Sequence, residues 1–111
     1  MKLKLVSVHK YDYAKVLMLK MRGEKGEEAS LELPEKILES IGWRPSINDE
    51  VELEASPEVG DLSDWEIALS GQLLKAREGE VTYSCGGLLC TLKETGVATP
   101  RNIYLKLRRA R

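Results

Sequence analysis

The chain has 111 residues, of which 42% are hydrophobic and 32% are charged, and its formal net charge is −1. This composition excludes intrinsic disorder, and the length suits one domain, residues 1–111, with a modest core. A dedicated duplex-DNA binder usually carries a basic excess that neutralises phosphates, whereas here 17 Lys and Arg stand against 18 Asp and Glu.

The apolar stretches are short. The stretch from Val16 to Leu19 is among the longest and is far too short to span a membrane. The N-terminus, Met1-Lys2-Leu3-Lys4, begins no sustained apolar run, so we expect no signal peptide and no membrane partner. The expected location is the cytoplasm.

Alternating apolar residues predict three strands in the first third of the chain, over residues 2–10, 14–22 and 27–33. In the first strand the apolar face changes between Leu5 and Val6, which is typical of a long, bent strand in a barrel. Gly23-Glu24-Lys25-Gly26 predicts the turn between the second and third strands. In the second strand Leu17, Leu19 and Met21 share one face and Val16 and Met18 the other, and in the third strand Ala29, Leu31 and Leu33 are expected to point inward.

A short helix is expected next. Pro34 ends the third strand and suits the first turn of a helix, because its missing N–H is not needed there. Ile37, Leu38 and Ile41 follow at helical spacing, and Gly42 is suited to the position after the helix. The pattern therefore predicts a helix over residues 34–41.

Strand patterns return after this helix, over residues 50–55, 64–77, 80–93 and 101–109. The connection over residues 56–61 collects Pro, Gly and acids, and we expect it to be mobile but too short to separate domains. Glu78-Gly79 predicts a turn. Residues 64–77 place one set of side chains on a single face, namely Trp65, Ile67, Leu69, Gly71 and Leu73.

These patterns together predict seven or eight short strands, one short helix and no internal repeat. Many alternating strands at hairpin spacing are typical of a closed or nearly closed antiparallel barrel. The fold class predicted from the sequence is therefore all-β and barrel-like.

Residues that could support catalysis or bind a metal are scarce. His9 is the only histidine, so Ser-His, Cys-His and histidine-rich metal arrangements lack a partner, and we interpret it as a partly exposed strand residue. Asp61, Asp64 and Glu66 lack the glycine and the bidentate glutamate of a calcium loop, which favours a solvated turn. The 23–26 segment lacks the spacing and the Lys-Ser/Thr ending of a phosphate loop. We expect no catalytic residue, metal, cofactor or small-molecule substrate.

The two cysteines, Cys85 and Cys90, are too few for a zinc site or a disulfide framework. Their spacing of five places them on opposite faces of a regular strand, which disfavours a disulfide unless a bulge resets the alternation. We interpret both as small buried apolar residues.

Basic residues gather at the C-terminus, at Lys106, Arg108, Arg109 and Arg111, with Tyr104 in the same strand. One interpretation is a solvated edge strand, where Lys and Arg prevent edge pairing. The other is contact with RNA or with an acidic partner through Tyr104, Lys106, Arg108 and Arg109.

Gly86-Gly87-Leu88-Leu89 lies where a strand is expected to continue. Adjacent glycines are tolerated where a chain bends sharply or where another backbone approaches closely. Leu88 and Leu89 face opposite ways in an extended chain, so one can fill the core while the other serves an outer surface. A barrel corner and a docking surface both remain open.

The segment from Ser84 to Leu92 resembles the Ser-x-Gly-Gly-Leu-Leu-x-x-Leu signature of the small RNA polymerase subunit called G in archaea, the counterpart of the eighth subunit shared by the eukaryotic nuclear polymerases. Asp64-Trp65, Gly71 and Leu73-Leu74 fit the preceding strand of this family, and Ile103-Tyr104-Leu105 with Lys106 and Arg108-Arg109 is similar to its closing strand. The resemblance covers residues 64–109. The family often has an aromatic residue before the glycines and a methionine after the leucines, where this chain has Cys85 and Cys90. The short segment between Ala55 and Asp64 is typical of the archaeal branch.

This resemblance implies an OB-like barrel without enzymatic activity, bound to the outside of the largest polymerase subunit near its pore and in contact with other polymerase subunits. It implies only weak or indirect contact with DNA or RNA. The partner-binding residues expected from it are Tyr83, Cys85, Gly86, Gly87 and Leu88.

Two other classes of function remain as alternatives. A free-standing OB domain for single-stranded nucleic acid needs aromatic platforms beside a basic groove. Of the aromatic residues Tyr11, Tyr13, Trp43, Trp65, Tyr83 and Tyr104, only Tyr104 lies in a basic stretch. A small β-barrel enzyme, the third possibility, lacks the residues that it needs.

Overall fold

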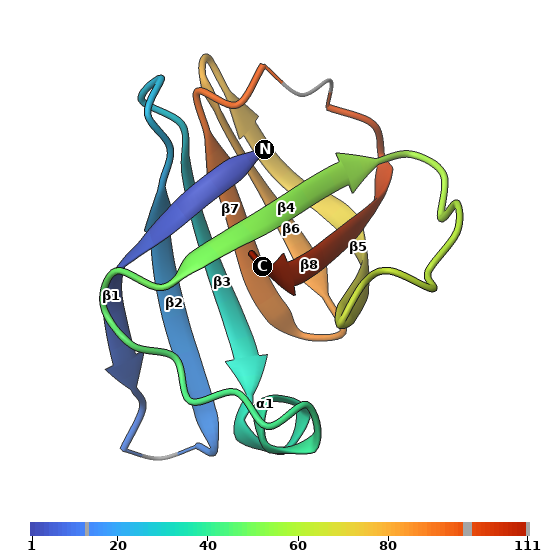
Figure 1. The fold of residues 1–111 in the computed structure, drawn as a ribbon. Coiled ribbons are helices and arrows are strands. Elements are labelled where there is room, and N and C mark those ends of the chain that lie inside the picture. The colour runs from blue at the N-terminus through green and yellow to red at the C-terminus, as the bar shows by residue number, and fades with distance from the viewer. Residues whose placement is uncertain (13, 97–98, 111) are drawn as a thin grey trace.

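The strand alternation in the sequence closes into an antiparallel barrel in the computed structural model, which describes residues 1–12, 14–96 and 99–110 (Figure 1). Within this part of the chain the order of strands around the barrel is β1-β2-β3-β7-β6-β5-β8-β4, and β4 pairs back to β1. The strands are β1 (Lys2–Lys10), β2 (Val16–Arg22), β3 (Glu28–Pro34), β4 (Glu50–Ser56), β5 (Ile67–Arg77), β6 (Glu80–Cys85), β7 (Leu88–Lys93) and β8 (Asn102–Arg109). The prediction of an all-β, antiparallel, barrel-like fold with seven or eight strands and one short helix is confirmed.

The core lies inside the barrel and consists of the inward positions of each strand. Ala29, Leu31 and Leu33 are buried, as predicted. In the first two strands the buried residues are Leu3, Leu5, Leu19 and Met21, and Leu17 is partly buried against the core. The buried residues of the other five strands are Val51, Leu53, Ile67, Val81, Tyr83, Cys85, Cys90, Leu92, Ile103, Leu105 and Leu107. Burial of this apolar surface is the main force that holds the barrel together.

The bend expected in β1 is a β-bulge. The register with β2 shifts between Leu5 and Ser7, so Leu5 lies opposite Met21 and Val8 lies opposite Leu19. The extra residue moves Val8 back to the inward side, where it packs against the core. This bulge is therefore the cause of the change of apolar face that the sequence shows between Leu5 and Val6.

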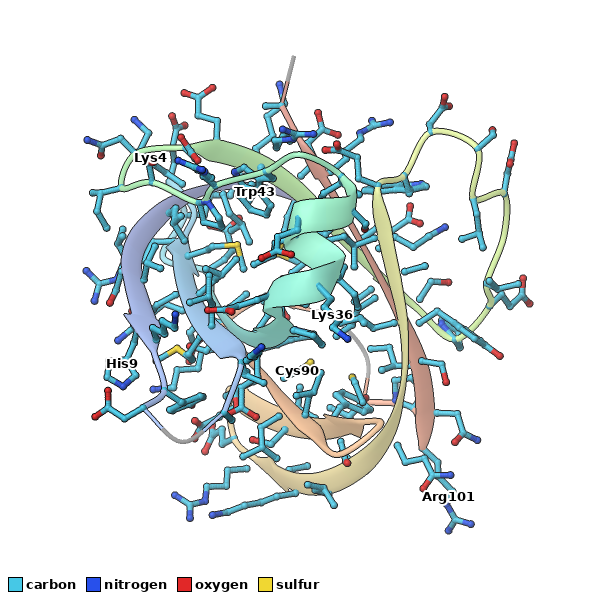
Figure 2. All side chains as sticks on the ribbon, turned by 90° about the horizontal axis from the view of Figure 1, so that it is seen from below. Lys4, His9, Lys36, Trp43, Cys90 and Arg101 are labelled. Atoms are coloured by element: carbon cyan, nitrogen blue, oxygen red, sulfur yellow. The ribbon has the colours of Figure 1, made fainter. Side chains whose placement is uncertain are left out.

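The helix α1 (Glu35–Ser40) covers one end of the barrel (Figure 2). Pro34 is the last residue of β3 and the N-cap of the helix, and Gly42 follows the C-cap residue Ile41 with a φ of +67°. Six residues are too few for a stable isolated helix, so α1 depends on packing of Leu38 against the core.

Candidate partner-binding site

The β6–β7 connection is a two-residue hairpin at Gly86-Gly87. Cys85 lies opposite Leu88 across the hairpin, and the two glycines have φ values of +64° and +89°. Positive φ at both central residues defines a type I′ turn, the geometry that suits the twist of paired strands. The prediction of one continuous strand over residues 80–93 was wrong, because glycine adopts these φ values without the Cβ clash that other residues suffer.

Tyr83 and Cys85 point into the barrel. Tyr83 is fully buried and Cys85 is 5% exposed, and the Tyr83 hydroxyl donates a hydrogen bond of 2.8 Å to the Pro100 carbonyl oxygen. Their strand, β6, pairs with β5 on one side and β7 on the other. These two residues therefore support the hairpin from inside, whereas Gly86, Gly87 and Leu89 are exposed to solvent.

Leu88 and Leu89 face opposite sides, as the sequence predicted. Leu88 is half-buried, whereas Leu89 is 46% exposed. The Leu89 backbone N–H donates a hydrogen bond of 2.7 Å to Glu32 Oε1, and the Tyr11 hydroxyl donates one of 2.6 Å to Glu32 Oε2. Glu32 thus continues the β3–β7 contact beyond the last paired residues, Leu31 and Cys90. No pattern in the sequence singled out Glu32, because its partners are 21 and 57 residues away.

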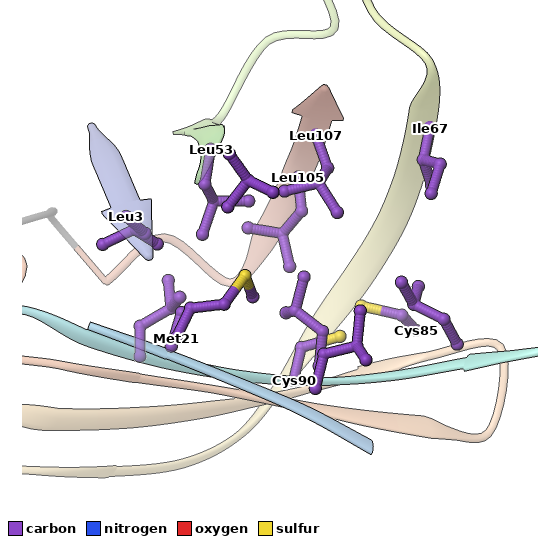
Figure 3. Close-up of a cluster of buried hydrophobic side chains, with 14 of the residues drawn as sticks. Leu3, Met21, Leu53, Ile67, Cys85, Cys90, Leu105 and Leu107 are labelled. Atoms are coloured by element: carbon purple, nitrogen blue, oxygen red, sulfur yellow. The ribbon is translucent and has the colours of Figure 1, made fainter. Parts of the chain in front are cut away.

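Cys85 and Cys90 both point into the core (Figure 3). A regular strand would place them on opposite faces, but the turn at Gly86-Gly87 pairs Cys85 with Leu88 and thereby brings Cys90 to the inward side as well. Their interpretation as buried free thiols is confirmed. A hydrogen bond with Cys85, together with burial, raises the pKa of the Cys90 thiol and keeps it protonated.

The basic residues of β8 are paired with carboxylates of this same chain. Lys106 is 4% exposed, and its Nζ lies 2.6 Å from Glu54 Oε2. Arg108 Nη2 lies 2.8 Å from Glu52 Oε2, which lowers the pKa of Glu52 and raises that of Arg108. The interpretation as a solvated edge strand was wrong, because β8 is hydrogen-bonded to β4 and to β5.

Trp65 covers this pair of cations from outside. Lys106 Nζ lies 5.5 Å and the Arg108 guanidinium carbon 4.6 Å from the centre of its ring. A Cβ at Gly60 would lie 3.2 Å from Lys106 Nζ, so the 57–66 segment crosses close over β8. The sequence predicted that Trp65 lies in the same strand as Ile67 and shares its face, which was wrong because β5 begins at Ile67.

Arg109 joins β8 to the helix. Its guanidinium group forms an ion pair with Glu66, and the hydrogen bond between them raises the pKa of Arg109. Arg109 Nη2 also donates a hydrogen bond of 2.9 Å to the Ile41 carbonyl oxygen. A cation at the C-terminus of a helix is favourable because the carbonyl oxygens there carry partial negative charge. Lys106, Arg108 and Arg109 thus hold the fold together, while Tyr104 is half-buried on the outer side of β8. Arg111 lies outside the described residues.

The other residues considered for catalysis or metal binding are His9 and the acidic residues Asp61, Asp64 and Glu66. His9 is exposed and makes an edge-to-face contact of 5.3 Å with the Tyr11 ring. Asp61 accepts a hydrogen bond of 2.9 Å from the Ser63 N–H, which lowers the pKa of Asp61, while Glu66 binds Arg109. Among residues 1–12, 14–96 and 99–110, no group of three or more His, Cys, Asp or Glu side chains is arranged to hold a metal ion.

Comparison with known proteins identifies no relative: no family model matches the chain, and no curated protein matches it in sequence. In the described part of the chain, no helix has the length and apolar character needed to cross a membrane. The function of the chain is therefore inferred from the resemblance at residues 64–109 and from the geometry of the barrel.

Proposed function

We propose that the chain is a non-catalytic subunit of an archaeal DNA-directed RNA polymerase, related to the small subunit that residues 64–109 resemble, and that it acts in the cytoplasm. It docks on the largest polymerase subunit and supports assembly of the enzyme and transcription. Its contacts with DNA or RNA are weak or indirect.

One observation carries this proposal. The segment that resembles the signature of this polymerase family, Ser84–Leu92, forms a hairpin whose tip is the glycine turn and whose outer side presents Leu89 at 46% exposure. An exposed leucine beside a tight turn is suited to docking on another protein, because a partner that covers it removes apolar surface from water. Leu88, on the opposite side of β7, is half-buried.

The alternative, a free-standing domain that binds single-stranded nucleic acid, has less support. Bases stack on exposed aromatic rings beside cations. Trp43 is 6% exposed and donates a hydrogen bond of 3.0 Å to Asp49, and Tyr83 is fully buried. Trp65 lies against Lys106 and Arg108, whose charges are already paired with glutamates. These three rings offer no basic groove for a nucleic acid strand.

Affinity purification of the tagged chain from its native cell tests the proposal, with the bound proteins identified by mass spectrometry. We expect the largest polymerase subunit at stoichiometric amounts, together with other polymerase subunits. Recovery of the chain without any polymerase subunit would contradict the proposal.

A binding assay separates the two functions. We expect the isolated chain to bind a single-stranded oligonucleotide weakly, and with an affinity that falls steeply as salt rises, because contact with phosphates is electrostatic. Tight binding that resists salt would instead support the nucleic-acid-binding alternative.

A further inference from the structure

The strand β4 covers only the first half of β1. The two strands pair over residues 2–4, and two further backbone hydrogen bonds of 2.8 Å join Leu5 to Asn48 and Asp49. Beyond Leu5 the strand β1 continues to Lys10, and there it pairs on one side only, with β2. Figure 1 shows this second half of β1 on the outside of the barrel, with no strand on its far side. We call residues 6–10 the open edge.

The pairing with β2 decides which backbone groups the open edge presents. The Tyr11 N–H donates a hydrogen bond of 3.2 Å to the carbonyl oxygen of the first residue of β2, so the backbone of Tyr11 is directed toward β2. This direction alternates along a strand, and His9 and Ser7 therefore face β2 as well. The N–H and C=O groups of Val8 and Lys10 point the other way. Within residues 1–12, 14–96 and 99–110, no backbone hydrogen bond is formed on that side of these two residues.

The edge is open because the chain turns away from β1 just before β4. Asn48 has a φ of +78°, in the left-handed region, so the residues before it do not continue the line of β4. The Asp49 carboxylate holds this turn, since its Oδ2 accepts hydrogen bonds of 2.9 Å from the Ser46 N–H and 3.0 Å from Trp43 Nε1. Ile47, in the same turn, is 53% exposed. A hydrogen-bonded turn thus creates the open edge and places an exposed aliphatic side chain next to the last residue that bonds to β1.

The chemistry of the open edge determines the kind of partner. A row of unpaired N–H and C=O groups on a strand edge is recognised by another extended strand, which adds to the sheet through backbone hydrogen bonds. The strand that already pairs with β1 shows which side chains fit. β4 begins Glu-Val-Glu-Leu-Glu, in which carboxylates alternate with aliphatic residues, and its Glu50 and Glu52 lie opposite Lys4 and Lys2.

The open edge combines an aliphatic residue and a cation in the same way. Val8 packs against the core, and the side chain of Lys10 remains 66% exposed although Glu35 Oε1 lies 3.0 Å from its Nζ. Residues 6–10 contain no carboxylate. A second copy of this edge would therefore offer Lys10 no opposite charge, whereas a strand with the alternation of β4 would offer one.

We infer that the open edge binds an extended segment of another protein, in which aliphatic residues alternate with carboxylates; the inference is independent of the function proposed above. The segment pairs with the N–H and C=O groups of Val8 and Lys10 and continues the sheet where β4 leaves it. Its aliphatic residues cover the exposed side chain of Ile47, and a carboxylate of the segment pairs with Lys10.

Binding of a synthetic peptide to the full chain tests this inference. The probe is a peptide of the β4 sequence, Glu50–Ser56, blocked at both ends. With saturating peptide, the amides of Val8 and Lys10 should exchange with deuterium about tenfold more slowly, because a paired amide exchanges only when the pairing opens. The amides of Ser7 and His9, which already face β2, are the internal control and should change little. A peptide with lysine in place of each glutamate should bind about tenfold more weakly, because it brings like charges together.

A proline on the open edge tests the backbone hydrogen bonds directly. Lys10→Pro removes an N–H that forms no bond to β2, so the barrel should melt close to the wild type. It should bind the peptide about tenfold more weakly, which corresponds to one lost hydrogen bond. Lys10→Ala is the matched control, because it removes the same charge and keeps the N–H, and it should bind within about threefold of the wild type. If Lys10→Pro unfolds, two peptides N-methylated at alternate residues replace it, since only one of them loses the amides that face β1.

Other results would overturn the inference. If the peptide leaves exchange at Val8 and Lys10 unchanged up to its solubility limit, Lys10 and the β1 bulge only protect the edge from pairing. Equal binding by Lys10→Pro and Lys10→Ala, or by the two N-methylated peptides, would mean that the backbone of the edge makes no contact. Protection of Val8 and Lys10 that rises with the concentration of the chain alone would identify a second copy as the occupant.

Discussion

The guanidinium carbon of Arg108 lies 4.6 Å from the centre of the Trp65 ring, so the residue just before β5 closes over the outer side of β8. Lys106 lies under the same ring, and its side chain is 6% exposed. The 57–66 segment is therefore anchored by a contact between an aromatic ring and two cations whose charges are balanced by Glu52 and Glu54.

Trp65→Ala should release this segment. We expect the free energy of unfolding to fall by about 1–2 kcal/mol, the size of cation–π contacts with partial burial, and we expect Glu-specific protease to cleave faster after Glu58. Leu62→Ala is the matched control, because Leu62 lies in the same segment and is 43% exposed. Equal cleavage of wild type and Trp65→Ala would show that the ring does not anchor the segment.

The turn at Gly86-Gly87 gives a second prediction. A Cβ at either glycine would meet no atom within 4 Å, so a side chain there is penalised by the positive φ alone. Gly86→Val should destabilise the barrel by about 1–2 kcal/mol, because β-branched residues resist the left-handed region, while Gly86→Asn should be tolerated. Urea unfolding of both variants measures the difference.

Gly87→Val distinguishes a role of this glycine in forming the turn from a role in docking on a partner. If the glycine serves the turn, the variant melts early and still co-purifies with the largest subunit. If the glycine lets a partner approach the backbone, the variant loses co-purification by more than its loss of stability explains. The φ of +89° is by itself a sufficient reason for a glycine at position 87. The open space around Gly87 also leaves room for a partner.

The fold was more predictable from sequence than the site. Alternation identified the strands and the bulge near Leu5, because the side-chain period of a strand depends only on local sequence. It continued one strand through Gly86-Gly87 and left a sharp bend there as only one of two interpretations, since the leucines and cysteines on both sides continue an apolar pattern. The roles of Lys106, Arg108 and Arg109 were also missed, because their carboxylate partners lie 43 to 56 residues away and meet them only in the closed barrel.

Gly71 gives a third prediction, which concerns packing inside the barrel. A Cβ at Gly71 would lie 2.8 Å from Cys85 Sγ and 3.2 Å from Tyr83 Cβ. Gly71→Ala should therefore destabilise the barrel by about 1–3 kcal/mol through overpacking. Gly23→Ala is the control: Gly23 also lies outside the positive-φ region, and its Cβ would meet only the movable end of Glu27.

The cause can be isolated with Cys85→Ala, which removes the sulfur that the new methyl group would meet. The double variant should be more stable than the sum of the two single effects predicts, by about 0.5–2 kcal/mol, because neighbouring changes that relieve one clash are not additive. Strict additivity in urea unfolding would mean that the Cys85 sulfur is not the obstacle.

Alkaline pH gives the last prediction, through Tyr83. Burial raises the pKa of its hydroxyl above the ordinary value of 10.0, so the folded state holds the proton longer than the unfolded state. The stability that depends on this group is fully present below the unfolded pKa and is lost as the pH rises through the folded pKa. The loss of unfolding free energy should approach about 1.4 kcal/mol for each pH unit in that window.

Tyr83→Phe isolates this contribution from the other groups that titrate above pH 9, including the Cys90 thiol, whose pKa is also raised. At pH 7 the variant should be less stable by about 0.5–1.5 kcal/mol, because it loses the hydrogen bond to Pro100 and leaves that carbonyl oxygen without it. Between pH 10 and 11 its stability should fall less steeply than that of the wild type, so the two curves converge. Parallel curves would mean that the Tyr83 hydroxyl ionises as readily in the barrel as in the unfolded chain, and that its burial does not raise its pKa.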